Sequence, residues 1–345
     1  MFDVAEAAGV SIATVSAFLN STSNVSPDLT QRIETAIRDI GYQRNAIARS
    51  LKIGSTRTIG LTVVDIRNPF FTDVVATIQQ VLNKAGYAVM LCSNDEDIAK
   101  QDEQIKLLLD RMVDGLIVAP AGEDDVMKRL VTSTRKPVVL IDRVCDDLDI
   151  DAVTLDNQKG VFDATTYLIG LGHRRIGYIS GSPNTSTGRD RLAGYYQALN
   201  SSDIAFSPDL IREGHFREAD GYRAAMQLLT MTDRPSAIFS ANNLMVIGAM
   251  RAIRDMGLTC PDDISVACMD DFPWADVFSP KLTTIAQPVE AIGEQAAHLL
   301  LDRLAGRAPD HSRQIVLRGR LTVRSSCQPF APPKSLRPSR QSHSA

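Results

Sequence analysis

The sequence predicts an α/β protein in which a small helical headpiece precedes two lobes, each built around a doubly wound parallel sheet. The first 42 residues carry helical periodicity alone. From Thr58 onward, short apolar runs that suit buried strands alternate with amphipathic segments, which is typical of parallel sheets with helices on both faces. The 345-residue chain carries more such runs than one compact sheet usually holds. We therefore expect two similar halves that divide near Asp156-Asn157.

The first two helices of the headpiece lie within residues 3–20. Small or apolar residues line one face of the first helix, and an apolar stripe at helical spacing follows the turn at Gly9-Val10-Ser11. Gly9 suits a turn position with positive φ, and Ser11 can cap the second helix. Small residues let the helices cross closely, which is the layout of a helix-turn-helix that reads DNA with its second helix. Because many short helix pairs only pack into cores, this pattern alone leaves both interpretations open.

A third helix begins at Ser26-Pro27, where a capping side chain precedes a proline at the first helical position, and it ends at Gly41. The three helices predict a headpiece over residues 1–43. Residues 44–57 follow as a short hinge helix or linker.

The two lobes are expected within residues 58–327. The expected strands are 59–65, 88–93, 115–119, 138–142, 152–155, 176–181, 237–241 and 265–270. The expected helices are 71–85, 101–112, 158–171, 191–199, 221–229 and 244–256. A late helix over 289–304 should return to the first lobe, and a late strand is expected over 314–323. This assigns about 58–157 and 288–316 to lobe 1, and about 158–287 and 317–327 to lobe 2. Residues 328–345 are rich in proline, serine and basic residues without periodicity, so we predict a disordered tail there.

Composition indicates a soluble globular protein, with 44% hydrophobic and 23% charged residues. No apolar run approaches the ~18 residues of a membrane helix. The first residues lack the features of a signal peptide, so a cytoplasmic location without membrane contact is expected. The five cysteines are scattered without a C-x-x-C pair, which argues against a disulfide framework and against a structural metal.

Net charge alone does not predict that the headpiece binds DNA. The net charge of the chain is −4, and residues 1–56 carry five basic and five acidic residues. Residues 40–64, however, carry four cations and no acid, namely Arg44, Arg49, Lys52 and Arg57. This basic strip is placed where phosphate contacts would help a neighbouring helix read bases.

Ordered motifs along residues 2–326 resemble those of the LacI/GalR (lactose/galactose repressor) family of bacterial transcriptional regulators. The motifs are Asp3-Val4-Ala5, Gly9-Val10-Ser11, Thr14-Val15-Ser16, Ala48-Arg49-Ser50-Leu51, Ile59-Gly60-Leu61, Asn68-Pro69-Phe70-Phe71, Val113-Asp114-Gly115, Gly172-His173-Arg174, Arg191-Leu192-Ala193-Gly194, Gly248-Ala249-Met250-Arg251 and Pro280-Lys281-Leu282-Thr283-Thr284. The resemblance implies a homodimeric repressor whose headpieces read two operator half-sites. It also implies a core like the periplasmic sugar-binding proteins, with three crossings between lobes and an effector in the cleft.

The resemblance also implies which residues contact DNA. In the family the segment matching 45–52 folds into a hinge helix on the operator, where the residue matching Leu51 wedges into the minor groove. The alternative for Leu51 is an ordinary apolar contact in a linker helix. The DNA-binding candidates are Ser11, Ile12, Ala13, Thr14, Ser16, Ala17, Asn20, Arg44, Asn45, Arg49, Leu51 and Lys52.

The reading positions depart from the family pattern. Ile12, Ala13 and Ala17 fall where relatives often carry polar residues, and none of them can form the bidentate pairs that distinguish guanine or adenine. Contacts with thymine methyl groups would remain, with Thr14 and Ser16 mainly positioning the backbone. We therefore expect a degenerate or A·T-favouring half-site.

The expected effector site lies at the carboxyl ends of strands, where ligands of open α/β sheets bind. Asp65, Asp142, Asp156 and Asp270 each end an apolar strand run. The family alignment gives nine effector candidates: Phe70, Phe71, Asp142, Thr187, Arg191, Phe216, Asn242, Asp270 and Gln287. Carboxylate, guanidinium and amide groups between aromatic walls suit a sugar, and the arginine would also accept a sugar acid. An ion pair between Arg191 and Asp270 is the structural alternative.

Two other classes of protein fit the sequence less well. An enzyme is disfavoured because the sequence lacks a Gly-x-Gly-x-x-Gly turn, a Walker loop, His-Glu-x-x-His and Gly-x-Ser-x-Gly, and no cofactor or metal is expected. A transport sugar-binding protein would need an export signal in place of residues 1–56.

Overall fold

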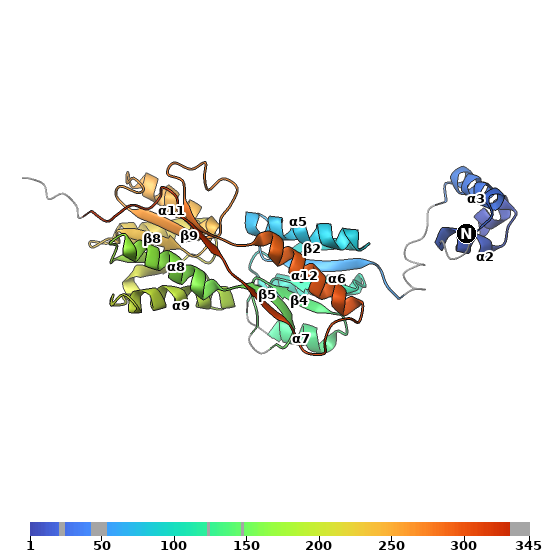
Figure 1. Ribbon diagram of the computed structural model, residues 1–345, viewed down its shortest axis with the longest axis horizontal. Coiled ribbons are helices and arrows are strands. Elements are labelled where there is room, and N and C mark those ends of the chain that lie inside the picture. Colours follow the sequence, from blue (N-terminus) through green and yellow to red (C-terminus); the bar gives the residue numbers. More distant parts are fainter. Residues whose placement is uncertain (21–24, 43–53, 123–124, 146–147, 332–345) are drawn as a thin grey trace, which may run out of the picture. The chain divides into compact units, whose positions relative to one another are not determined.

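The computed structural model describes residues 1–20, 25–42, 54–122, 125–145 and 148–331, which fall into two compact units (Figure 1). We call Met1–Thr56 the headpiece and Arg57–Ala345 the core. The expected hinge contacts Arg44, Asn45, Arg49, Leu51 and Lys52 lie outside the described residues.

The headpiece consists of the three expected helices, α1 (Phe2–Ala8), α2 (Ile12–Asn20) and α3 (Pro27–Ile40). Gly9 has a φ of 61° and ends α1, and Gly41 has a φ of 64° and ends α3. The Ser26 hydroxyl caps α3 by accepting a hydrogen bond from the Leu29 amide. One apolar cluster holds the three helices together, made of Val4, Ala5, Ala8, Val15, Ile33 and Ala36.

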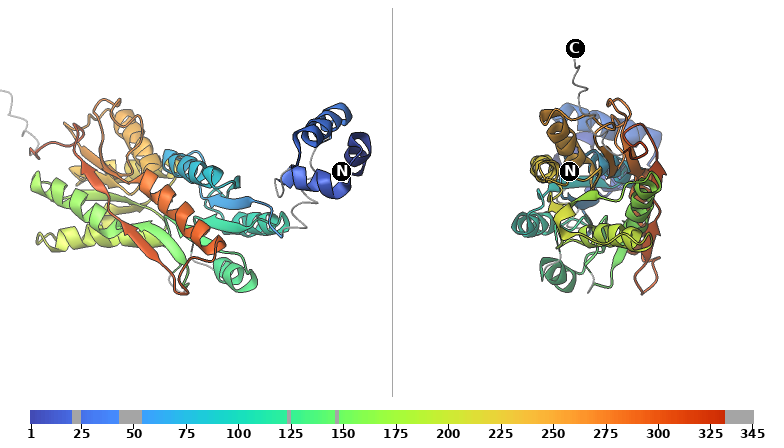
Figure 2. Two further views of the ribbon diagram at one scale, coloured as in Figure 1. Left: turned by 45° about the vertical axis from the view of Figure 1, so that its right-hand side comes forward. Right: turned by 90° about the vertical axis from the view of Figure 1, so that its left-hand side faces the viewer.

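Lobe 1 is a six-stranded, all-parallel sheet in the order β2-β1-β3-β4-β5-β11. Its strands are β1 (Thr58–Val63), β2 (Ala88–Ser93), β3 (Gly115–Val118), β4 (Val138–Ile141), β5 (Asp151–Leu155) and β11 (Gln314–Leu317). Its helices are α5 (Pro69–Lys84), α6 (Ile98–Asp110), α7 (Asp125–Ser133) and α12 (Val289–Leu304). Helices α5 and α12 lie side by side on one face (Figures 1 and 2), and α6 and α7 cover the other, so each face buries its own apolar cluster.

Lobe 2 repeats this layout in the order β7-β6-β8-β9-β10-β12. Its strands are β6 (Ile176–Ser180), β7 (Ile211–Glu213), β8 (Ala237–Ser240), β9 (Ser265–Met269), β10 (Thr283–Ala286) and β12 (Arg320–Thr322). Its helices are α8 (Asn157–Gly170), α9 (Ser186–Asn200), a 3-10 turn at Pro208–Leu210, α10 (Glu218–Leu229) and α11 (Asn243–Asp255). Each strand of lobe 2 therefore has a counterpart in lobe 1, such as β9 for β4 and β7 for β2.

The chain passes between the lobes three times, from β5 to α8, from β10 to α12 and from β11 to β12. The helix over 289–304 packs against α5 and three strands of lobe 1, as predicted. The single strand predicted over 314–323 is wrong, because Arg318 and Gly319 divide it into β11 in lobe 1 and β12 in lobe 2. Strand β12 is also antiparallel to β10, whereas only parallel strands were predicted.

The prediction of disorder from residue 328 is wrong for residues 328–331. The Phe330 amide donates to the Leu171 carbonyl at 2.8 Å, and the Gln328 carbonyl lies 3.1 Å from Nε2 of buried His173. Residues 332–345 lie outside the described part of the chain. Among the described residues no single helix is long and apolar enough to cross a membrane, although the bent pair α1 and α2 together reaches that length and composition.

Candidate effector cleft and DNA-reading helix

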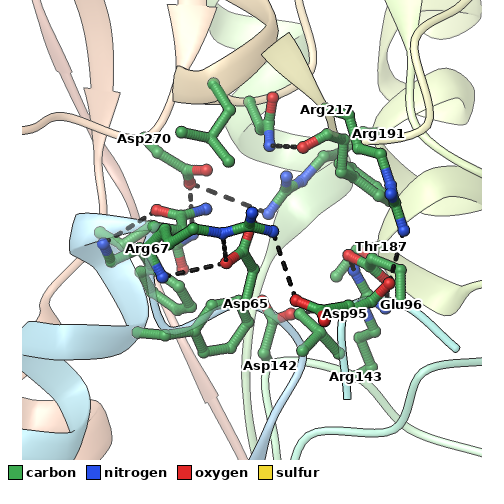
Figure 3. Close-up of a pocket in the computed structure, with 18 residues that line it drawn as sticks. Asp65, Arg67, Asp95, Glu96, Asp142, Arg143, Thr187, Arg191, Arg217 and Asp270 are labelled. Carbon is green, nitrogen blue, oxygen red and sulfur yellow. Dashed lines mark hydrogen bonds and ion pairs between the residues drawn. The ribbon is translucent and has the colours of Figure 1, made fainter. Parts of the chain in front are cut away.

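The nine expected effector residues line one pocket between the two lobes (Figure 3). They come from lobe 1 (Phe70, Phe71 and Asp142), from lobe 2 (Thr187, Arg191, Phe216, Asn242 and Asp270) and from the crossing after β10 (Gln287). About 470 Å³ of atom-free space, part of it open to solvent, lies among these side chains, but the centre of a water-sized sphere fits into only about 30 Å³ of it. The two lobes are therefore closed on each other in this structure.

Asp142 and Asp270 occupy equivalent positions in the two lobes. Each follows the strand at the same place in its sheet, β4 and β9, and each adopts a left-handed backbone, with φ of 65° and 70°. Aspartate tolerates this conformation better than most residues, yet it still costs energy, and such residues cluster at functional sites. Both side chains are buried at the cleft.

The electrostatics of the two carboxylates differ in detail. Burial raises the pKa of Asp142 to about 6, against the stabilising effect of Arg143 and Arg191. Burial also raises the pKa of Asp270, and Arg191 and Gln287 oppose that rise. Gln287 Nε2 donates to Asp270 Oδ1 at 2.6 Å, whereas the nearest cation to Asp142 is Arg143 Nε at 3.4 Å from Oδ2. Asp142 is therefore the less satisfied of the two.

Arg191 lies within α9 and is held by lobe 2 itself. Its Nε donates to Asn157 Oδ1 at 2.7 Å, and its Nη1 donates to the Ala241 carbonyl at 2.7 Å. Its Nη2 lies 3.9 Å from Asp270 Oδ1, and its guanidinium lies 5.9 Å from the Phe216 ring centroid. The ion pair considered as the alternative role is thus present but long, and part of the guanidinium still faces the cleft.

Asn242 lines the cleft, but hydrogen bonds within lobe 2 engage its side chain. Its Oδ1 accepts from the Met245 amide and caps α11, while its Nδ2 donates to the Phe216 carbonyl at 3.1 Å. The Phe216 ring lies against Gly181, where an added Cβ would be 1.9 Å from the ring. Asn242 and Gly181 therefore fix the aromatic wall of the cleft.

Several pocket residues were not predicted as contacts, and most of them are charged. Arg143 forms a bidentate pair with Glu96, with Nη1 to Oε2 at 2.6 Å and Nη2 to Oε1 at 2.7 Å. At the mouth of the cleft, Arg67 pairs with both Asp65 and Asp95. The further unpredicted lining residues are Val64, Asn68, Arg217 and Leu244. Each of these unpredicted residues lies within five positions after the end of β1, β2, β4, β7 or β8, and this position is the sequence signal that could have identified them.

The exposed face of α2 is apolar, as the sequence indicated. Ile12 is 48% exposed and Ala13 is exposed, while Ala17 is half-buried. The Ser11 hydroxyl caps α2 by accepting from the Thr14 amide at 3.1 Å, and it also lies 2.8 Å from Thr14 Oγ1. Both hydroxyls are therefore engaged in shaping the helix start.

Arg32 of α3 fixes the turn between α1 and α2. Its Nη2 donates to the Ala8 carbonyl at 2.6 Å and to the Gly9 carbonyl at 3.2 Å. These carbonyls end α1 and would otherwise lack a helical partner. No local sequence pattern indicates this role of Arg32, because the contact joins residues more than twenty positions apart.

Comparisons with known proteins agree with this architecture. Residues 1–45 match the family described as bacterial regulatory proteins, lacI family, and residues 165–327 match the periplasmic binding protein-like domain. The chain is 34% identical to the HTH-type transcriptional repressor PurR of Aliivibrio salmonicida (strain LFI1238), over 91% of this chain and 94% of that protein.

Two solved structures are similar over nearly the whole chain. The lac repressor dimer bound to operator and the anti-inducer ONPF has a TM-score of 0.84 and 29% identity, covering 94% of this chain and 98% of that one. The transcriptional regulator CelR in complex with cellobiose has a TM-score of 0.73 and 30% identity, with the same coverage. The chain therefore belongs to the lacI family of bacterial regulatory proteins, and it is a DNA-binding transcriptional repressor that responds to a small-molecule effector.

Proposed function

We propose that the effector is an uncharged, hydroxyl-rich compound, a sugar or a sugar derivative, bound between Asp142 and Asp270. The observation that carries this proposal is the pair of buried carboxylates presented by equivalent strands of the two lobes. A carboxylate is an acceptor only, so each would take hydrogen bonds from hydroxyl groups of the effector. Phe70, Phe71 and Phe216 would supply the apolar walls.

Charge pairing in the cleft disfavours an anion. Arg143 is already paired with Glu96, and Arg67 is already paired with Asp65 and Asp95. Without displacing one of these carboxylates, an acidic effector would have to rely on Arg191 and Arg217, in a pocket that the buried Asp142 and Asp270 also line. A neutral polyol would instead satisfy the buried carboxylate, which costs free energy while it lacks partners. A neutral sugar is therefore the first candidate for the effector, and a sugar acid is the second.

The structure of the CelR complex supports the sugar class, since that neighbour binds cellobiose. The lac repressor neighbour was solved as a dimer on its operator, which supports a homodimer on operator DNA for this chain and hence a site of action in the cytoplasm. The match of residues 1–45 to the lacI family favours a regulator over a transport protein that shares only the core.

Switching would follow from lobe closure. Hydrogen bonds from Val144 to Ser186 and from Asn243 to Asn68 join the two lobes, so the lobes would part to admit the effector and then close around it. Effector binding would stabilise one packing of the core over another and thereby alter operator affinity through the segment between headpiece and core.

For DNA we propose that α2 reads its half-site mainly through apolar contacts of Ile12, Ala13 and Ala17 with thymine methyl groups. The engagement of Ser11 and Thr14 in the helix cap supports this proposal. Selection of bound sequences from a random library would test it. A strong guanine preference opposite Ala17 would contradict it.

A thermal-shift screen of the full chain against sugars, sugar acids and nucleobases tests the effector proposal. We expect a stabilising shift with a neutral sugar that is lost in the Arg191→Ala variant. Arg223→Ala serves as the matched control, because Arg223 is exposed on α10 and lies outside the pocket. A sugar shift that persists unchanged in Arg191→Ala would contradict the site, and a shift with a sugar acid alone would contradict the neutral class.

A further inference from the structure

The loops that follow strands β2 and β7 are counterparts, because these strands form the same edge of the two sheets. In lobe 1 the Asn94 amide donates to the Val63 carbonyl that ends β1. In lobe 2 the Gly214 amide donates to the Ser180 carbonyl that ends β6. The turn that follows closes with an equivalent hydrogen bond in each loop. The Asp97 amide donates to the Asn94 carbonyl, and the Arg217 amide donates to the Gly214 carbonyl. The two loops therefore share one backbone design.

Both loops also hold two consecutive non-glycine residues with positive φ. These are Asp95 and Glu96 in lobe 1, at 55° and 59°, and His215 and Phe216 in lobe 2, at 48° and 59°. A positive φ costs conformational free energy for residues other than glycine, and aromatic residues tolerate it poorly. The rest of each lobe must therefore hold its loop in place, which is typical of segments that a function requires.

The two loops differ at the residue that caps the following helix. Asp97 caps α6 and accepts hydrogen bonds from the amides of Ala99 and Lys100. The equivalent cap of α10 is Arg217, whose side chain makes no cap hydrogen bond. An arginine there cannot accept from the helix amides and places a positive charge at the positive end of the helix. Local helix stability therefore does not explain Arg217.

Arg217 makes its contact with the other lobe instead. Its Nη2 donates to the Asp95 carbonyl of lobe 1 at 2.5 Å, and no carboxylate among the described residues pairs with it. The Asp95 side chain is held by Arg67 and Lys100 of lobe 1, so the carbonyl faces lobe 2 from a fixed loop. In Figure 3 the Arg217 side chain extends toward the loop that carries Asp95, while Arg67 reaches the Asp95 side chain from within the pocket.

A second contact between the loops lies deeper in the cleft. Glu96 holds Arg143, whose guanidinium lies 5.1 Å from the centroid of the Phe216 ring in lobe 2. The two strained loops therefore meet in two places. At the mouth of the cleft Arg217 contacts Asp95, and deeper in the cleft Glu96 is linked to Phe216 through Arg143. The contact at the mouth of the cleft is made by one side chain, that of Arg217.

The geometry points to Arg217 as a positioning residue that latches the two lobes across the mouth of the effector cleft. The inference rests on the proposed effector function of this cleft, since closure matters only if a ligand enters there. Arg217 favours the closed core and thereby sets how readily the cleft opens, at the expense of the cap that its counterpart Asp97 provides.

Hydrogen exchange of the full chain without any effector tests the latch. The Val144 amide of lobe 1 donates to Ser186 Oγ of lobe 2 at 3.0 Å, so opening of the lobes exposes it to exchange. In Arg217→Ala we expect the peptide that contains Val144 to exchange about tenfold faster, as for the loss of one charge-assisted hydrogen bond. Arg217→Lys should restore part of the protection, and Arg223→Ala, on the same helix, should leave it unchanged.

The Arg217→Ser variant separates latching from helix stability. Serine can cap α10, so this variant should melt at a higher temperature than Arg217→Ala while its Val144 peptide exchanges equally fast. Protection of Val144 that is unchanged in Arg217→Ala, or that recovers in Arg217→Ser together with stability, would overturn the latch. Because no effector is used, either result leaves the proposed effector function to its own thermal-shift test.

Discussion

Replacing Asp142 by asparagine should stabilise the protein at alkaline pH. Burial raises the pKa of this carboxyl to about 6, against an ordinary value of 3.8. Each pH unit between these values corresponds to about 1.4 kcal/mol, so the ionised side chain costs about 3 kcal/mol of stability at pH 8. Asparagine has a similar shape and no charge, so most of this cost should disappear in the Asp142→Asn variant.

The sign of the pH dependence follows from the raised pKa. The folded protein binds a proton at Asp142 more tightly than the unfolded chain does. Protonated Asp142 therefore makes its full contribution to the free energy of unfolding below pH 3.8, and this contribution is lost as the pH rises through about 6. The advantage of Asp142→Asn over the parent should accordingly be about 3 kcal/mol at pH 8 and well under 1 kcal/mol at pH 4.

Urea unfolding followed by circular dichroism at pH 8 and pH 4 measures this difference, because effects of other titrating groups cancel between variant and parent. Asp110→Asn is the matched control, since Asp110 is exposed at the end of α6 and its replacement should change little at either pH. An Asp142→Asn variant that is no more stable than the parent at pH 8, or whose advantage does not shrink at pH 4, would refute the reasoning.

Three further predictions concern other parts of the chain. Gly181→Ala should weaken any effector-induced thermal shift, because its Cβ would lie 1.9 Å from the Phe216 ring and displace it; an undiminished shift would argue against Phe216 as a wall. Arg32→Ala should lower headpiece stability by about 1–3 kcal/mol and weaken operator binding in a gel shift, since the carbonyls of the turn lose their partner; full operator affinity would contradict this. Burial lowers the pKa of His173, so the parent should lose stability as the pH falls below 6.5 and His173→Gln should lose less; equal acid-side losses in melting curves would contradict the assignment.

The fold could be predicted wherever the local pattern was strong. Strands β1, β3 and β4 are buried apolar runs, and their periodicity is enough to identify them. Strand β7 is three residues long and incompletely buried, while β10 begins with the fully buried polar pair Thr283-Thr284. Neither has an apolar pattern, so only pairing with neighbouring strands reveals them.

The candidate site could be predicted as a set of strand ends, but not as a network. The sequence placed Asp142 and Arg191 in one cleft because parallel strands and the family pattern bring them there. It did not reveal that Glu96 holds Arg143, since these residues lie 47 positions apart and meet only in the folded lobe. It also did not reveal that Asn242 is engaged by α11 and Phe216. Hydrogen bonds between distant segments are a property of the tertiary structure.

The effector proposed for the cleft would control how tightly the headpiece binds DNA. The most direct measurement is the affinity of the full chain for an operator selected in vitro, with and without the sugar found by thermal shift, for the parent and for Arg191→Ala. We expect the sugar to change parental affinity by about 5- to 150-fold, and to leave the affinity of Arg191→Ala unaltered. Operator affinity that ignores a bound sugar in the parent, or that still responds in Arg191→Ala, would contradict the account.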